Sequence, residues 1–138
     1  MIVVDTNVLS EVMRPIPSGK VARWMAERPA SSLFTTTITL GEVLYGLELV
    51  PSGKRRVALQ QAIEKMFEEE FSGRILTFDR DAARAFADIS ARRRRIGRPI
   101  GEMDGQIAGI ARSRGAAIAT RNVLDFQDCG VQLIDPWS

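Results

Sequence analysis

The sequence predicts an α/β fold, a single-domain, three-layer arrangement in which a mainly parallel sheet is flanked by helices. Short apolar runs rich in β-branched residues alternate with longer segments whose apolar residues recur at helical spacing. This alternation implies crossover connections, which make neighbouring strands parallel and cover both faces of the sheet with helices. No repeat, linker or low-complexity tract interrupts the pattern, and 138 residues is close to the usual size of one domain. We therefore expect one domain over residues 1–138.

The strands are predicted from runs of β-branched and aromatic residues. Ile2–Val4 is the clearest case, because consecutive β-branched apolar residues are typical of a strand that is buried on both faces. The later predicted strands are Leu33–Thr36, Arg74–Phe78, Ala117–Thr120 and Val131–Ile134.

The helices are predicted from apolar stripes bounded by capping and stop residues. Val21, Trp24 and Met25 share one helical face, and Asp79 is a candidate N-cap of a later helix. The predicted helices begin near Val8, run from Ser18 to Pro29, cover Gly41–Leu49 and Lys54–Phe71, run from Asp79 to Arg95, and cover Glu102–Arg114.

The chain contains no histidine and a single cysteine, Cys129. These absences exclude a Ser-His-Asp triad, a Cys-His pair, a His-bearing zinc site and an internal disulfide. We interpret Cys129 as a packed thiol in a protein of a reducing compartment. Because carboxylates, hydroxyls, lysine and arginine remain available, an oxygen-liganded metal is the leading means of catalysis.

Hydropathy and charge predict a cytoplasmic protein that has no membrane partner. No window approaches the roughly 18 uncharged apolar residues of a membrane span, and the first apolar run meets Asp5 at once, unlike a secretory signal. The 19 basic and 17 acidic residues give a net charge of +2, with a pI near 9.1. This balance is compatible with nucleic-acid binding but is not that of a histone-like protein.

Two carboxylates follow predicted strands, where each has both a structural and a functional interpretation. Asp5 comes directly after Ile2–Val4, at the strand end where ligands of parallel sheets bind, but it also suits the N-cap of the next helix. Glu42 lies three residues after Thr39, which is the spacing of a capping box, and it equally suits a ligand in the first turn after the second strand.

Three further polar residues are predicted near the same edge of the sheet. Asp104 lies in the first turn of Glu102–Arg114, on its apolar stripe, and Asn122 and Asp125 follow the fourth strand. Each also suits a turn or helix start. Together with Asp5 and Glu42 they would repel one another without a cation, and hard oxygen ligands favour Mg²⁺ or Mn²⁺. The same helix carries Gly101, Gly105 and Gly109 at a spacing of four, which favours close backbone packing.

Five segments, taken together and in this order, resemble the PIN-domain family of metal-dependent ribonucleases and, within it, the VapC/FitB-type toxins. They are VVDTNVLSE at Val3–Glu11, TTITLGEVLYGLE from Thr35, IGEMDGQIAGIA from Ile100, IATRNVLDF at Ile118–Phe126, and the closing LIDPW.

The resemblance implies a PIN fold and hydrolysis of RNA phosphodiester bonds by water activated by Mg²⁺ or Mn²⁺. It places the catalytic and metal-binding carboxylates on Asp5, Glu42 and Asp104, with Asp125 or Asn122 in the fourth position. Because Asn122 stands where some members have aspartate, Asp125 becomes the expected fourth carboxylate. Supporting hydrogen bonds are expected from two further residues, Asn7 and Thr120.

The resemblance also implies two protein partners. One is a cognate VapB/FitA-like antitoxin whose terminal segment wraps the toxin and brings a basic side chain into the carboxylates. The other is a second copy in a homodimer, for which Leu44, Tyr45 and Leu47 are candidates, although core packing explains them equally well.

The basic residues have less specific interpretations. Arg92–Arg95 and Lys54–Arg56 are interpreted as solvated faces, and three other residues are candidate phosphate contacts: Arg112, Arg114 and Arg121. The competing hypothesis for the whole chain is a catalytically silent binding module that acts through an antitoxin complex, and Asn122 is its only support. A phosphatase with Asp5 as nucleophile is disfavoured because Asn7 cannot serve as its general acid.

Overall fold

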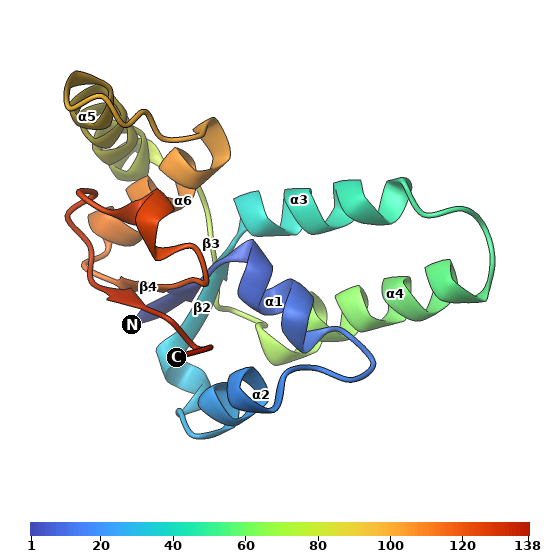
Figure 1. The fold of residues 1–138 in the computed structure, drawn as a ribbon. Helices are drawn as coiled ribbons and strands as arrows, with labels where there is room; N and C mark the ends of the chain where they lie inside the picture. Colours follow the sequence, from blue (N-terminus) through green and yellow to red (C-terminus); the bar gives the residue numbers. More distant parts are fainter.

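A computed structural model describes all 138 residues and contains a five-stranded, wholly parallel sheet in the order β3-β2-β1-β4-β5 (Figure 1). The predicted α/β class and parallel sheet are confirmed. The strands are β1 (Ile2–Val4), β2 (Leu33–Thr36), β3 (Ile75–Leu76), β4 (Ala117–Ala119) and β5 (Leu133–Ile134).

The edge strands are shorter than predicted. β3 forms register pairs only at Ile75 and Leu76, and β5 only at Leu133 and Ile134. Each edge strand has a neighbour on one side only, so fewer backbone groups can join the ladder. The central strand β1 pairs with β2 and β4, which fixes where it ends and where Asp5 begins.

Six α-helices cover the sheet, and most of their bounds agree with the predicted segments. They are α1 (Thr6–Val12), α2 (Gly19–Ala26), α3 (Thr37–Glu48), α4 (Lys54–Glu64), α5 (Arg80–Arg95) and α6 (Glu102–Ser113). Short helices also form at Ala30–Ser32 (η1), Lys65–Glu70 (η2) and Val123–Phe126 (η3). None of the helices is both long and apolar enough to cross a membrane.

Two predicted helix bounds were wrong. α3 begins at Thr37, four residues before the predicted start, because Thr36 is its N-cap and its hydroxyl accepts the Thr39 amide hydrogen at 3.0 Å. α4 ends at Glu64, and the chain continues to Glu70 as a π-helical segment rather than as one regular helix.

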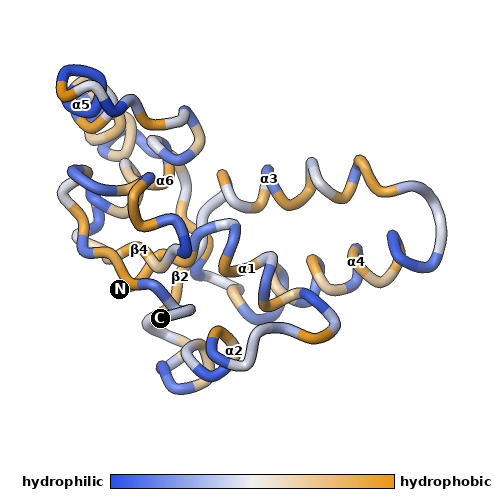
Figure 2. Tube along the Cα trace, in the orientation of Figure 1, coloured by the Kyte–Doolittle hydropathy of each residue, from blue (hydrophilic) through white to orange (hydrophobic).

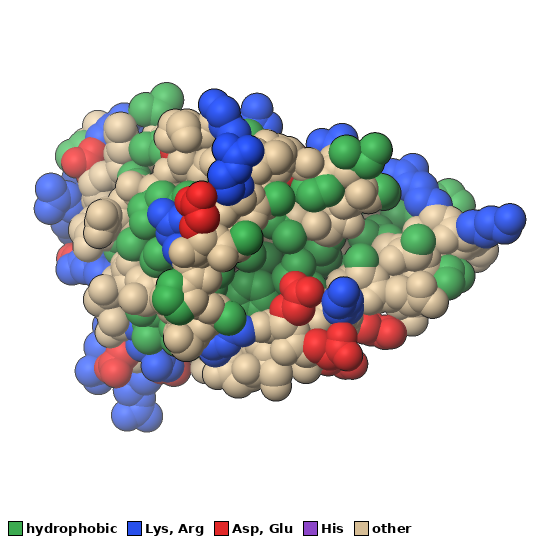
Figure 3. All heavy atoms as spheres, turned by 90° about the horizontal axis from the view of Figure 1, so that it is seen from below, with side chains coloured by type: hydrophobic (Ala, Val, Ile, Leu, Met, Phe, Trp, Pro, Cys, Tyr) green, Lys and Arg blue, Asp and Glu red, His purple; other side chains and the backbone are tan.

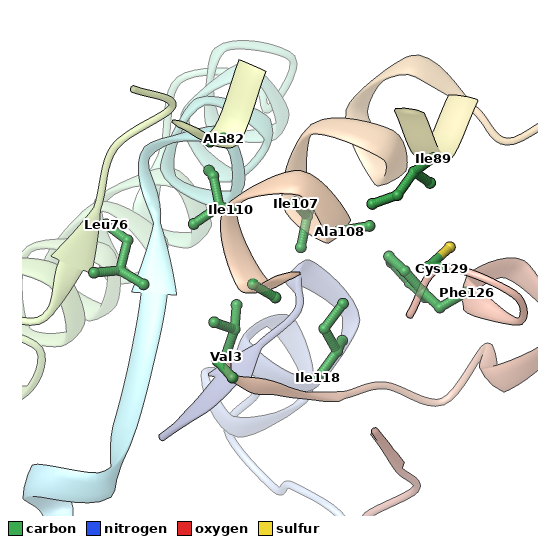
Figure 4. Packing of buried hydrophobic residues seen from close by; sticks show 12 residues of the cluster. Val3, Leu76, Ala82, Ile89, Ile107, Ala108, Ile110, Ile118, Phe126 and Cys129 are labelled. Carbon is green, nitrogen blue, oxygen red and sulfur yellow. The ribbon is translucent and has the colours of Figure 1, made fainter. Parts of the chain in front are cut away.

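Adjacent residues of β1 enter different hydrophobic cores on the two faces of the sheet. Val3 packs with residues of α5 and α6, as Figure 4 shows, whereas Val4 packs with residues of α1, α2, α3 and α4. This alternation is the ordinary consequence of strand geometry. Cys129 is buried in the first core, which confirms its prediction as a packed thiol.

Helices α3 and α4 form an arm that projects from the rest of the molecule (Figure 1). The helices carry hydrophobic and hydrophilic residues in alternation along their length (Figure 2). Leu47 lies in the second core, but Leu44 and Tyr45 are exposed, by 42% and 67%. Core packing therefore explains Leu47 and leaves the other two on the surface.

The glycine stripe of α6 allows this helix to approach α5 closely. A Cβ atom at Gly109 would lie 2.7 Å from the Ala82 carbonyl oxygen and 2.9 Å from the Phe86 amide nitrogen, and one at Gly105 would lie 3.1 Å from the Phe86 ring. The predicted backbone packing is confirmed at Gly109, whereas the atoms that a Cβ atom at Gly105 would meet belong to side chains. The prediction is wrong for Gly101, which lies outside the helix as its N-cap.

We expect Gly109→Ala to lower the free energy of unfolding by about 1–3 kcal/mol, because its methyl group would overlap backbone atoms of α5 that cannot move aside alone. Urea unfolding measures this change. Gly46→Ala in α3 is the matched control, since its Cβ would meet open space, and it should stabilise the chain by about 0.5–1 kcal/mol through helix propensity. Equal effects of the two substitutions would contradict the close approach.

Candidate metal centre at the carboxyl edge of the sheet

The four predicted carboxylates come from four separate elements at one edge of the sheet. Asp5 follows β1, Glu42 lies in the second turn of α3, Asp104 lies in the first turn of α6, and Asp125 lies in η3. The parallel strands all end at this edge, so the segments that follow β1, β2 and β4 meet there.

Asp5 is the N-cap of α1, as one interpretation of its sequence position predicted, and it is also buried. It caps α1, because its Oδ1 accepts the Val8 amide hydrogen at 3.0 Å, and it is only 4% exposed. Burial raises the pKa of Asp5, and hydrogen bonds from the Thr120 hydroxyl and from the Val8 and Asn7 amides oppose this rise. The nearby Glu42 charge raises the pKa further. The capping bond therefore fixes the position of the carboxyl group.

The capping-box interpretation of Glu42 was wrong. The Thr39 amide is already satisfied by Thr36, one turn earlier than expected, so Glu42 has no helix terminus to cap. Its Oε1 instead accepts a hydrogen bond from the Thr6 hydroxyl at 2.8 Å. This bond joins α3 to α1 and directs the carboxylate towards the segment that follows Asp5.

Asp104 lies among the other three acids. Partial burial raises the pKa of its carboxyl group to about 6, and the charges of Asp125, Glu42 and Asp5 raise it in that order. Arg93 acts in the opposite direction. Because the Asp104 carboxyl group is repelled by three carboxylates from other elements, this part of the surface has an excess of negative charge.

Asn122 and Asp125 have different surroundings, although they are only three residues apart. The Asp125 carboxylate is exposed and acts on Asp104. Asn122 precedes η3, and its backbone N–H donates to the Thr120 hydroxyl at 3.0 Å. Together with Asn7, it lines a polar cavity. The two candidates for the fourth position therefore face different parts of the site.

The donor atoms fit a hard divalent cation, but they are not gathered into a finished coordination sphere. No three acidic side chains lie close enough together, as placed, to hold one ion between them. The available donors are all oxygen atoms, which Mg²⁺ and Mn²⁺ prefer. Glu42 is also engaged by Thr6, so its carboxylate would have to rotate to join a shared ion.

Arg93 is the residue whose role the sequence interpretation missed. It belongs to the run Arg92–Arg95, expected to be solvated, yet it is only 4% exposed. Its Nη1 donates to the carbonyl oxygens of Asp125 at 2.7 Å and Gln127 at 3.0 Å, and its Nε donates to that of Arg98 at 2.7 Å. Arg93 thus joins α5 to the segment that carries Asp125.

The remaining basic residues are spread over the molecule. Arg56, also expected to be solvated, is half-buried and donates to the Leu47 and Val50 carbonyl oxygens. On the face shown in Figure 3, lysine and arginine side chains lie at several separate places rather than in one patch. Ion pairs are formed by Arg112 with Asp88 at 2.7 Å and by Arg114 with Asp79 at 3.6 Å.

Two cavities lie along α1 next to the carboxylates. One, of about 820 Å³, lies between α1 and the arm and is lined by Thr6 and Glu42 as well as by apolar residues of α3 and α4. The other, of about 550 Å³, extends from Asn7 and Asn122 to Trp137. Ser10 and Arg14 line both cavities, so the exposed side of α1 separates them.

The model of the PIN domain family matches residues 2–127 of this chain. The chain is 39% identical over 137 residues to the VapC ribonuclease Y4jK of Sinorhizobium fredii, covering 99% of this chain and 98% of the relative. It is 34% identical to toxin FitB of Neisseria gonorrhoeae, covering 99% of each chain. The crystal structure of the FitAcB complex from Neisseria gonorrhoeae contains a chain that superposes with a TM-score of 0.92 at 34% identity, again covering 99% of each.

The chain therefore belongs to the PIN domain family, and the predicted PIN fold is confirmed. Within that family it is a toxin of the VapC/FitB type, as the resemblance of its five segments indicated.

We expect Asp104→Asn to stabilise the metal-free protein above pH 6. The folded-state pKa of about 6 lies above the ordinary pKa of an aspartate, which is 3.8. Between pH 3.8 and pH 6 the folded state therefore binds more protons than the unfolded state, and the wild type loses stability as the pH rises through this range. Asparagine does not titrate, so the variant does not lose stability from this position as the pH rises. Urea unfolding in chelator from pH 4 to pH 8 should show a difference that grows with pH. Glu69→Gln, at an exposed position, is the control and should show none. A variant less stable than the wild type at pH 8 would contradict the excess of negative charge.

We expect Arg93→Met to lower the free energy of unfolding by about 2–4 kcal/mol, because the partly buried carbonyl oxygens of the Asp125 segment would lose the charged donor that joins them to α5. Arg94→Met, at an exposed neighbouring position, should change it by less than about 0.5 kcal/mol. Denaturant unfolding of both variants measures the contrast. Similar values for the two would show that Arg93 does not hold the segment.

Proposed function

We propose that this chain is a Mg²⁺- or Mn²⁺-dependent endoribonuclease toxin that hydrolyses RNA phosphodiester bonds and is inhibited by a cognate antitoxin. The observation that carries the proposal is the position of Asp104 among Asp125, Glu42 and Asp5 at the carboxyl edge of a parallel sheet. The relatives support the substrate class, since they include a VapC ribonuclease and a tRNA(fMet)-specific endonuclease VapC of Shigella flexneri.

The residues of the site have two roles, which are to bind the metal ion and to position its ligands. Asp5 and Asp104, with Glu42 and Asp125, would hold the ion, which when bound activates water and offsets charge that develops on the phosphate. The hydrogen bond between the Thr120 hydroxyl and the Asp5 carboxyl group supports a role for Thr120 in positioning this ligand. No side chain forms a covalent bond to RNA in this scheme, so the absence of histidine is no obstacle.

The proposed mechanism, with water as the nucleophile, differs from cleavage by the 2′-hydroxyl of the RNA in the products that it leaves. Water attack at phosphorus releases the 3′-oxygen of the preceding nucleotide, and the products are a 5′-phosphate and a 3′-hydroxyl. Internal attack by the 2′-hydroxyl would instead leave a cyclic phosphate. The chemistry of the RNA ends therefore reports which nucleophile acts.

We also propose that the antitoxin occupies the 820 Å³ cavity between α1 and the arm. Its apolar lining from α3 and α4 suits a peptide segment, and Glu42 at its border would attract a basic side chain from that peptide. The structures of FitAB and of VapBC from Salmonella typhimurium are of toxin–antitoxin complexes bound to DNA, which supports a partner of this kind. Exposed Leu44 and Tyr45 on the arm remain candidates for a homodimer contact.

We expect the purified toxin to cleave RNA only with Mg²⁺ or Mn²⁺, and the activity to stop with chelator. Asp5→Asn and Asp104→Asn should each lower cleavage by at least about 100-fold, because each removes a charged ligand. Cleavage is measured on labelled RNA, and the 5′-phosphate is identified by its susceptibility to a phosphate-dependent exonuclease.

Two controls keep this test decisive. Circular dichroism and urea unfolding must show that both variants are folded, and Asp81→Asn, at an exposed acid in the first turn of α5, should keep full activity. Cleavage that persists in chelator would overturn the metal mechanism. A folded wild type that binds antitoxin but cleaves no RNA with any metal would favour the silent binding module.

A further inference from the structure

The cavity of about 550 Å³ next to Asn7 adjoins the candidate metal centre, and none of its four carboxylates lines it. It is lined by Asn7, Ser10, Glu11 and Arg14 of α1, by Arg121 and Asn122 after β4, and by Trp137 near the end of the chain. Its size is within the range of about 300–1,000 Å³ that is usual for ligand sites. Six of its seven lining residues are polar or charged, so it suits a polar ligand.

The cavity begins at the candidate metal centre and is tied to it by hydrogen bonds. The Asn7 backbone amide and the Thr120 hydroxyl both hydrogen-bond the Asp5 carboxyl group. The Asn122 backbone N–H in turn donates to the Thr120 hydroxyl at 3.0 Å. Both asparagines at the border of the cavity are therefore held by contacts that also hold Asp5.

Arg121 differs from the other candidate phosphate contacts because it has no acidic partner. Arg112 and Arg114 form ion pairs with Asp88 and Asp79, whereas Arg121 forms none. Its guanidinium lies over the Trp137 ring, 5.0 Å from the ring centre. An indole ring attracts a guanidinium without using its hydrogen-bond donors, so those donors stay available for a phosphate.

The other charged groups of the cavity are already engaged. The Glu11 carboxylate accepts the Ser18 amide hydrogen at 3.1 Å and contacts Arg14 at 3.4 Å. Arg14 is thus partly neutralised, and the acid of the cavity is occupied by two donors. Arg121 remains the unneutralised cation next to a strongly negative site.

We propose that this cavity binds the nucleotide of single-stranded RNA adjacent to the scissile phosphate, with Arg121 contacting its phosphate group and Trp137 holding Arg121 in place. The inference rests on the proposed ribonuclease function and adds a binding subsite to it. The need for such a cation follows from the carboxylates, which repel the RNA backbone. Amide groups of Asn7 and Asn122 face the same nucleotide and can hydrogen-bond its base or its 2′-hydroxyl.

The test measures binding of a short, fluorescently labelled single-stranded RNA of mixed sequence in chelator, where cleavage does not occur, at a series of salt concentrations. Losing one phosphate contact should lower the slope of log Kobs against log salt by about 0.7, which corresponds to roughly five-fold weaker binding at 0.1 M salt. We expect this change for Arg121→Gln. Arg121→Lys should keep the wild-type slope, because it keeps the charge.

Arg28→Gln is the matched control. Arg28 also lies over an indole, 4.1 Å from the Trp24 ring centre, but it follows α2 and precedes β2, at the opposite edge of the sheet. This variant removes the same charge and should leave the slope unchanged. Urea unfolding of all three variants excludes a change in fold.

The outcomes separate this subsite from the proposed function. A wild-type slope in Arg121→Gln, or an equal loss in Arg28→Gln, would overturn the subsite while the metal-dependent cleavage of RNA by the wild type could still stand. A wild type that neither binds nor cleaves RNA would instead overturn the proposed function on which the subsite rests.

Discussion

The fold brings together, at the carboxyl edge of a parallel sheet, carboxylates that repel one another. Burial makes this repulsion stronger, because Asp5 is almost completely removed from water and Asp104 is partly so. Burial and repulsion both raise the pKa of these acids, which means that gathering them as carboxylates destabilises the folded state. The remainder of the molecule must therefore supply the stability that keeps them there.

That stability comes from contacts that lie just behind the acids. The two cores on either side of β1 fix the strand that ends at Asp5, and the absence of a side chain at Gly109 lets α6 reach the position from which Asp104 faces the other acids. Arg93 fixes the position of Asp125 by donating to its backbone carbonyl oxygen rather than to its carboxylate. The Asp125 charge is thus left unpaired while its backbone is held, which suits a group that is to bind a cation.

The sequence was sufficient to predict the positions of the acids but not all of their contacts. Asp5 and Asp104 were located because an acid beside a buried strand, or on the apolar stripe of a helix, is a local anomaly. Glu42 was ambiguous because several threonines precede it, and the choice of Thr36 over Thr39 as N-cap depends on where β2 stops pairing. The burial of Arg93 had no local signal at all, since its acceptor on Asp125 lies 32 residues further along the chain. Long-range contacts of this kind cannot be inferred from spacing.

The position of α1 between the two cavities has a consequence for how inhibition would work. On the proposed function, a basic side chain of the antitoxin would neutralise the same carboxylates that bind the metal ion, so the two could not both be fully bound. Thermodynamic linkage then requires the metal to weaken antitoxin binding by the same factor as antitoxin weakens metal binding. RNA held at Arg121 lies on the other side of α1 and need not be displaced by the peptide itself. The antitoxin would therefore inhibit cleavage by weakening metal binding to the carboxylates, rather than by displacing RNA from Arg121.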